Sequence, residues 1–315
     1  MSPERWFPTA LLLVILAATA PPILGAGEPV ILFPPDMTLS LESGVKIFAF
    51  APGAETPLPV SVNGIAQEPL KGESFQNGEA TLNTGMNILN VGGKRVKIYH
   101  LPDVKMEEFR LSGGNEGAPL VFRSYRLHPA LDDGCEGCHL LEEGELKAKD
   151  QKEACYACHD NFEKKEEGGK ERSVHTPVKA GECTGCHDPH FSTLPKLQKL
   201  EKGCLECHDP FTSEGTVHYP VEKKECNPCH SPHAGPGPSQ VVLAGNALCF
   251  KCHKDFHTQH RSAQINKPAM TQIPPDVPRD KENISCIACH LPHQSDNRRL
   301  FRKSQGELCK SCHLM

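Results

Sequence analysis

The pentapeptide Cys-x-x-Cys-His occurs eight times in this chain, and no other sequence feature restricts the fold so strongly. The chain has 315 residues and 16 cysteines, and every cysteine belongs to one of these motifs. The cysteines are Cys135, Cys138, Cys155, Cys158, Cys183, Cys186, Cys204, Cys207, Cys226, Cys229, Cys249, Cys252, Cys286, Cys289, Cys309 and Cys312. The motifs end in His139, His159, His187, His208, His230, His253, His290 and His313.

Paired cysteines also occur in zinc ribbons and in disulfide-bonded secreted proteins, but neither needs a histidine directly after the second cysteine. Attachment of haem c does need it. Two thioether bonds hold the porphyrin, and the adjacent histidine is thereby placed against one face of the iron. The repeated motif therefore predicts eight covalent haem c groups, with the sixteen cysteines as attachment points and the eight motif histidines as proximal iron ligands.

The motifs are arranged in pairs. The first cysteines of a pair lie 20, 21, 23 and 23 residues apart, which defines four modules at about 126–160, 174–210, 217–255 and 256–315. An early histidine precedes the first motif in Val174-His175-Thr176-Pro177-Val178, and a late one follows it in His187-Asp188-Pro189-His190. The third module repeats both features, whereas the fourth shows only the late histidine, in His290-Leu291-Pro292-His293. The first module keeps His128 but has Leu140-Leu141 where the late histidine would be.

This arrangement resembles the doubled-CXXCH family of multihaem cytochromes over about residues 126–315. The resemblance implies haems in near-contact, with alternating stacked and angled neighbours that form a conducting row. Two departures leave the ligation of the terminal haems open: the missing late histidine of the first module and the proline-rich insertion Asn266 to Asp280.

The number of spare histidines indicates whether every haem iron can have a ligand on both faces. The chain has 17 histidines, of which eight are proximal, and His100 lies in the N-terminal region. The eight remaining histidines are the predicted distal ligands: His128, His175, His190, His218, His233, His257, His260 and His293. His190 follows His187 too closely to pass around the same porphyrin, so we expect the late histidines to bind haems of neighbouring motifs. His257 and His260 are weaker candidates, and Met270 or Met315 would be the alternative ligands.

The region before the motifs is different in character. Short β-segments are predicted at Val30 to Phe33, Val45 to Phe50, Pro59 to Val62, Glu79 to Leu82, Asn87 to Val91 and Arg95 to Tyr99. Turn dipeptides separate them at Asn63-Gly64, Asn77-Gly78 and Gly92-Gly93. The pattern predicts a small all-β sandwich. The run Val60-Ser61-Val62-Asn63-Gly64, with Phe75 and Leu82 to Ile88, resembles bacterial immunoglobulin-like domains, which implies a spacer or docking module; a spacer without chemistry is favoured.

The expected organisation is a signal peptide at 1–26, the β domain at 27–104, a linker at 105–125 and the cytochrome domain at 126–315. The signal rests on Arg5, the apolar run Ala10 to Ala20 and the cleavage site Leu24-Gly25-Ala26. An uncleaved anchor is the alternative. Since nothing later resembles a membrane-spanning helix, we expect a periplasmic or extracellular protein. Periodicity is weak beyond residue 126, so the second domain should be haem-packed, with short helices, loops and little regular secondary structure.

These features predict an electron carrier in anaerobic or extracellular respiration rather than an enzyme. Its expected partners are redox proteins, among them an outer-membrane conduit or cell-surface cytochromes. A net charge of −5 argues against a nucleic-acid binder. Two alternatives stay open: a multihaem reductase with one open haem, and an oligomeric or filament-forming cytochrome.

Overall fold

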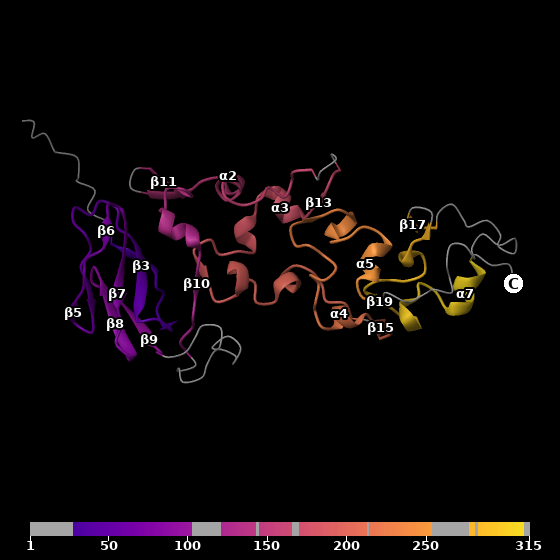
Figure 1. Ribbon diagram of the computed structural model, residues 1–315, viewed down its shortest axis with the longest axis horizontal. Helices are drawn as coiled ribbons and strands as arrows, with labels where there is room; N and C mark the ends of the chain where they lie inside the picture. The colour runs from indigo at the N-terminus through magenta and orange to yellow at the C-terminus, as the bar shows by residue number, and fades with distance from the viewer. Residues whose placement is uncertain are drawn as a thin grey trace, which may run out of the picture. The chain divides into compact units, whose positions relative to one another are not determined.

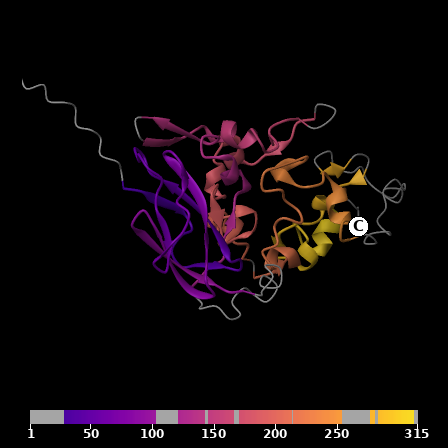
Figure 2. The same ribbon diagram turned by 60° about the vertical axis from the view of Figure 1, so that its left-hand side comes forward.

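The computed structural model describes residues 28–102, 121–142, 145–165, 170–212, 214–253, 277–280 and 283–311. The predicted signal peptide, most of the predicted linker, His257, His260, Cys312 and His313 lie outside these residues. The chain forms two compact units, one up to Ser124 with Glu143–Glu145 and one made of Tyr125–Glu142 and Leu146 onward. Figures 1 and 2 draw the described part of the first unit as strands, and the second as short helices joined by loops.

The first unit contains two sheets. One has the order β1-β3-β7-β6 and the other the order β2-β9-β8-β4-β5. Their bounds are β1 Val30–Phe33, β2 Thr38–Ser40, β3 Gly44–Phe50, β4 Val60–Val62, β5 Ile65–Ala66, β6 Lys71–Gly72, β7 Phe75–Thr81, β8 Gly85–Val91 and β9 Lys94–His100. All the described pairs are antiparallel except β2 with β9. This strand-rich, sandwich-like unit confirms the predicted fold class.

Alternation of apolar and polar residues fixes the inner face of each sheet. Ile47 of β3, Leu89 of β8 and Ile98 of β9 are fully buried. Each such side chain contributes roughly 1.5–3 kcal/mol by leaving water. Phe122 also belongs to this unit: it is buried against Leu39, although the sequence placed it in the linker. The Arg123 carbonyl accepts from Leu39 N at 2.8 Å, which adds this segment to the β2 edge.

Two of the three predicted turns are confirmed. Asn63-Gly64 joins β4 to β5 and Gly92-Gly93 joins β8 to β9, with positive φ at all four residues. The turn predicted at Asn77-Gly78 is wrong, because both residues lie inside β7. The physical reason for a glycine there is space: a Cβ on Gly78 would lie 2.9 Å from Leu70 Cδ2.

The second unit has little regular structure, as predicted. Its helices are α2 Gln151–Tyr156, α3 Thr176–Ala180, α4 Tyr219–Glu222, α5 Asn246–Phe250 and α7 Gln305–Lys310. Its 3₁₀ turns are η1 Pro129–Asp133, η2 Cys183–Gly185, η3 Pro195–Leu197, η4 Gly203–Glu206, η5 Pro238–Gln240, η6 Cys286–Ala288 and η7 Arg298–Leu300. Two hairpins are β11 His139–Glu142 with β12 Glu145–Ala148, and β17 Arg279–Asp280 with β18 Asn283–Ile284.

Short antiparallel strand pairs join each module to the next. They are β10 Arg126–Leu127 with β14 Phe191–Ser192, β13 Ser173–Val174 with β16 Ala234–Gly235, and β15 Thr216–Val217 with β19 Gln294–Ser295. Each pair combines the strand before an early histidine with the strand after the late histidine of the following module. Neighbouring modules are therefore joined by backbone hydrogen bonds.

Candidate haem-ligand site

One turn of helix shapes each described motif. The backbone N of the motif histidine donates to the carbonyl of the first cysteine, at 2.9 Å from His139 to Cys135 and 3.1 Å from His187 to Cys183. The same bond closes the motifs that end in His159, His208, His230, His253 and His290. Because residues i, i+3 and i+4 share one face of a helical turn, both thiols and the imidazole project to the same side.

Each early histidine lies where an extended segment ends and a short helix begins. His175 and His218 have extended backbone angles and directly precede the short helices α3 and α4, and His128 precedes η1 in the same way. A proline in the first turn of each of these elements fixes φ for the helical start, so the sequence His-Pro or His-x-Pro specifies this transition locally.

Six histidine pairs result from this arrangement. Three early histidines pair with the second-motif histidine of their own module: His128 with His159, His175 with His208, and His218 with His253. Three late histidines pair with the first-motif histidine of the preceding module: His190 with His139, His233 with His187, and His293 with His230. Ring centres lie 5.7 Å apart in the last pair and 6.1 Å apart in the His218 pair.

This separation is the one that a metal ion between two imidazoles needs. A metal–nitrogen bond is about 2 Å long and the ring centre lies about 1 Å beyond the nitrogen, so two ligands on opposite faces give ring centres about 6 Å apart. Direct contact between ring faces would bring them closer. The chain's own side chains therefore fit an iron held between two histidines at each of the six pairs.

Backbone carbonyls orient the imidazoles. His187 Nδ1 lies 2.9 Å from Lys196 O and His230 Nδ1 lies 2.8 Å from Ser239 O. His290 Nδ1 is held in the same way by Arg299 O at 2.9 Å. A carbonyl only accepts, so Nδ1 carries the proton and Nε2 keeps its lone pair for a metal.

Two early histidines are held in the same manner by the following module. His175 Nδ1 lies 3.1 Å from Pro232 O, and His218 Nδ1 lies 3.0 Å from Pro292 O. Backbone bonds reinforce this connection, since His175 N donates to His233 O at 2.8 Å. The pairs His175–His208 and His187–His233 are thus connected, because the strand before His175 is hydrogen-bonded to the strand after His233.

Burial favours the neutral form of five of the paired imidazoles. It is the largest cause that lowers the pKa of His128, His139, His218, His233 and His293, and the histidine across each pair lowers it further. A neutral imidazole is the form that binds a metal. The protonation state of these imidazoles and the distances between them are therefore both those of metal ligands.

Thiols meet at the junctions between modules. Cys155 is hydrogen-bonded to Cys183, Cys226 to Cys204 and Cys249 to Cys286. Burial and then Cys183 raise the pKa of Cys155 to about 11, whereas the hydrogen bond from Cys249 lowers the pKa of Cys286 to about 7. Each contact joins the second motif of one module to the first motif of the next, so the attachment points of successive motifs lie close together.

The first module resolves one of the two sequence departures. Its place for a late histidine is occupied by β11, which pairs with β12. His139 nevertheless has a histidine partner, because His190 comes from the second module. Each described late histidine thus lies opposite the first-motif histidine of the module before it. The two weaker distal candidates, His257 and His260, lie outside the described residues, as does the motif histidine His313.

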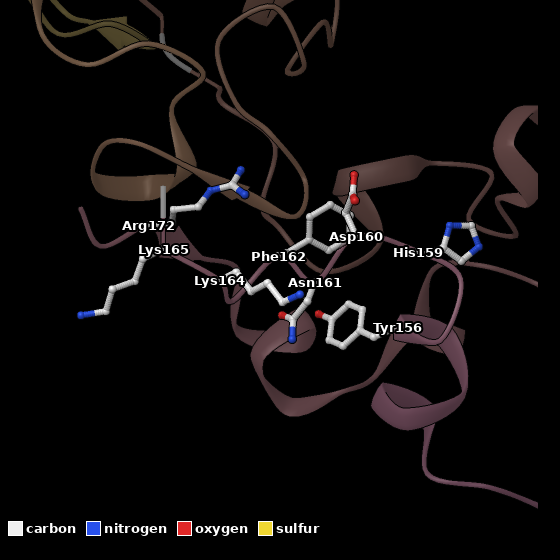
Figure 3. Close-up of a pocket in the computed structure, with 8 residues that line it drawn as sticks. All are labelled: Tyr156, His159, Asp160, Asn161, Phe162, Lys164, Lys165 and Arg172. Carbon is white, nitrogen blue, oxygen red and sulfur yellow. The ribbon is translucent and has the colours of Figure 1, made fainter. Parts of the chain in front are cut away.

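Sequence reasoning missed several side chains around the pairs. Phe162 lies 4.3 Å from the ring of His233, and Phe211 lies 4.4 Å from that of His293. A pocket of about 420 Å³ beside His159 is lined by Phe162 and by the cations Lys164, Lys165 and Arg172 (Figure 3). The repeated Cys-His-x-x-Phe spacing was the signal that could have identified both phenylalanines.

Comparison with known proteins agrees with this arrangement. The family model described as "Doubled CXXCH motif" matches residues 175–213, 218–258 and 278–314. The first module, where the β11–β12 hairpin occurs, is outside these matches. No curated protein and no solved structure matches the chain significantly.

The described residues contain no helix long and apolar enough to cross a membrane, and no cluster of three or more metal-binding side chains.

Proposed function

We propose, from the premise that its doubled motifs support a multihaem c-type cytochrome, that this protein binds eight haem c groups and conducts electrons along them. The observation that carries the proposal is the set of six histidine pairs, each with a motif histidine and a second histidine at the separation of two axial ligands. Haem supplies one-electron redox chemistry when bound. The chain supplies attachment, axial ligands and spacing.

Ligation by two histidines suits electron transfer rather than substrate conversion. A six-coordinate iron offers no position for a substrate, and no ligand has to leave when the iron changes its charge. The interlocked modules hold successive ligand pairs in a fixed relation through the strand pairs between modules. A rigid spacing of neighbouring redox centres is what repeated electron hops require.

Cationic side chains support haem binding at one site. Lys164, Lys165 and Arg172 line the pocket beside His159, and Figure 3 shows Arg172 on the side of Phe162 away from His159. A haem carries two propionates, and arginine and lysine bind carboxylates through charge-assisted hydrogen bonds. These cations would offset propionate charge at this site.

We further propose that the protein is exported and works in the periplasm or outside the cell, with redox proteins as partners. The apolar run near residue 10 supports export, and covalent haem attachment suits an oxidising compartment. The β unit would be an immunoglobulin-like spacer, since its two sheets carry a packed core.

Mass spectrometry and carbon monoxide binding test this proposal together. The natively exported protein should carry the mass of eight haems, and reduction should give low-spin spectra that carbon monoxide does not shift. A bare polypeptide mass would overturn haem binding altogether. A carbon monoxide adduct on one haem would instead favour a reductase, while eight unreactive haems would favour the electron carrier. Size-exclusion chromatography of the same sample would show whether it assembles into filaments.

A further inference from the structure

Two phenylalanines among the described residues occupy equivalent positions in the second unit, and the haem ligand set does not use them. Phe162 follows the second-motif histidine His159 by three residues, and Phe211 follows His208 by the same interval. Their rings lie 4.3 Å and 4.4 Å from the imidazoles of His233 and His293, with interplanar angles of 10° and 27°. These are near-parallel aromatic contacts at close range. The repeated geometry indicates a shared role.

Each contact joins three modules. Phe162 comes from the first module, His233 from the third, and the histidine paired with His233 is His187 of the second. Phe211, His293 and His230 repeat this relation one module further along. In both cases the phenylalanine covers the face of an imidazole that also lies opposite a motif histidine.

Phe162 is itself held in place. The edge of its ring is turned toward Tyr156, with centroids 6.3 Å apart and an interplanar angle of 72°. It lines the pocket beside His159 together with Lys164 (Figure 3). A ring fixed between Tyr156 and His233 restricts rotation of the imidazole about its own axis and keeps water from its face.

His190 gives an internal comparison. Its ring is paired with His139 as His233 is with His187, but the nearest charged group is a carboxylate, with Asp188 Oδ1 at 3.7 Å from His190 Nδ1. The third module has Ser231 and the fourth Leu291 at the position of Asp188. Among these three equivalent late histidines, His233 and His293 therefore have a phenylalanine ring against the imidazole, whereas His190 has a carboxylate beside it.

We propose that Phe162 and Phe211 are positioning residues that fix the ring planes of His233 and His293 and raise the reduction potentials of the two haems bound there. This rests on the proposed function, since it takes both imidazoles as axial ligands. An apolar cover disfavours the more highly charged oxidised iron, which raises the potential. The orientation of an axial imidazole affects the g-values of low-spin ferric haem, so both effects are measurable.

The test compares full-length, haem-loaded wild type with Phe162→Ala, Phe162→Tyr and Phe211→Ala, using electron paramagnetic resonance and potentiometric titration. Phe162→Ala should keep all haems, change the g-values of one low-spin signal and lower one potential. Phe162→Tyr keeps the ring and should behave as wild type, while Phe211→Ala should affect a different haem. Ile65→Ala, on the exposed surface of the first unit, is the matched control and should change neither quantity.

Unchanged g-values and potentials in Phe162→Ala would overturn the positioning role, as would a loss of haem or a shift spread over all centres, which would indicate a general structural role. Conversion of a single haem to high spin would also support the role, because it would show that the imidazole no longer stays bound to the iron without the phenylalanine. Failure of the proposed function is separate: wild type itself would lack low-spin signals from bis-histidine iron.

Discussion

A histidine three residues after a motif histidine cannot serve the same iron, and the structure shows which partner each late histidine meets. His190 lies 5.9 Å from His139 and belongs to the next module. In the sequence His190 stands next to the motif that ends in His187, but its ring lies opposite that of His139, 51 residues upstream. The residue-scale predictions concern these imidazoles and the charges beside them.

Replacing His190 by alanine should open one iron. We expect one haem of the loaded protein to become high-spin and to bind carbon monoxide, because the His139 site loses its second ligand while the porphyrin stays attached through two thioethers. Carbon monoxide titration monitored by visible spectroscopy measures the number of open sites. His100→Gln, in the first unit, is the control and should bind none. An unchanged low-spin spectrum in His190→Ala would show that this imidazole is not a ligand.

Replacing Asp188 by asparagine should raise one potential. The carboxylate lies 3.7 Å from His190 Nδ1, and its negative charge favours the oxidised iron. Asparagine keeps an oxygen for the backbone N–H groups of His190 and Phe191, which Asp188 Oδ1 now accepts at 2.9 Å and 3.2 Å. Potentiometry should show a single upward shift, and Asp36→Asn in the first unit should show none. A downward shift would contradict the assignment.

Acid should release the distal ligands only below the ordinary histidine pKa. Burial lowers the folded-state pKa of His128, His218 and His233, among others. Their contribution to stability is therefore fully present above the unfolded value of about 6.5 and is lost as pH falls through the lower folded value. A spectral pH titration should show low-spin haem at pH 6.5 and high-spin haem under more acidic conditions. Conversion already above pH 6.5 would contradict burial as the dominant effect.

Among the elements, the repeated left-handed turn is the one most closely tied to the site. Lys196 and Leu197, Ser239 and Gln240, and Arg299 and Leu300 all have positive φ without being glycine. Each such residue costs roughly 1–2 kcal/mol. The strain has a consequence for ligation, because the first carbonyl of each turn accepts from Nδ1 of a motif histidine. The second carbonyl accepts from the backbone N of the residue after that histidine.

Substitution of Ser239 tests the turn. A β-branched valine is strongly disfavoured at positive φ, so Ser239→Val should lower the denaturation midpoint by the equivalent of about 1–2 kcal/mol. Ser239→Gly should leave stability unchanged or slightly higher, since glycine adopts this conformation readily. Guanidinium denaturation of the loaded protein, followed at the Soret band, measures both. Equal midpoints for the two variants would show that the turn is not strained.

Across the whole molecule, the two units differ in what fills their interiors. Of the buried apolar side chains in the described residues, all except Ala234 belong to the first unit, among them Ile47, Leu89 and Ile98. The described part of the second unit therefore has almost no protein-only core, as its weak periodicity predicted. Haems held between the two histidines of each pair would supply that apolar volume.

Blocking haem attachment should unfold one unit and leave the other intact. In cells without c-type haem maturation, the exported chain should keep a protease-resistant β unit while the second unit is degraded, because conformational entropy is not offset there by burial. Limited proteolysis with mass spectrometry of the surviving fragment measures this. A haem-free second unit as resistant as the first would contradict a haem-built core.

The sequence by itself determined the chemistry of attachment, the four modules, the number of spare histidines and the β character of the first unit, because these follow from spacing and alternation along the chain. The tertiary structure decided which histidines lie opposite one another, that the late histidine lies opposite a motif histidine of the preceding module, and that the Phe162 ring lies against His233. Those relations depend on strand pairing between segments such as β13 and β16, about 60 residues apart. Spacing along the chain does not encode which segments will share that pairing, since each strand of only two residues could pair with several others.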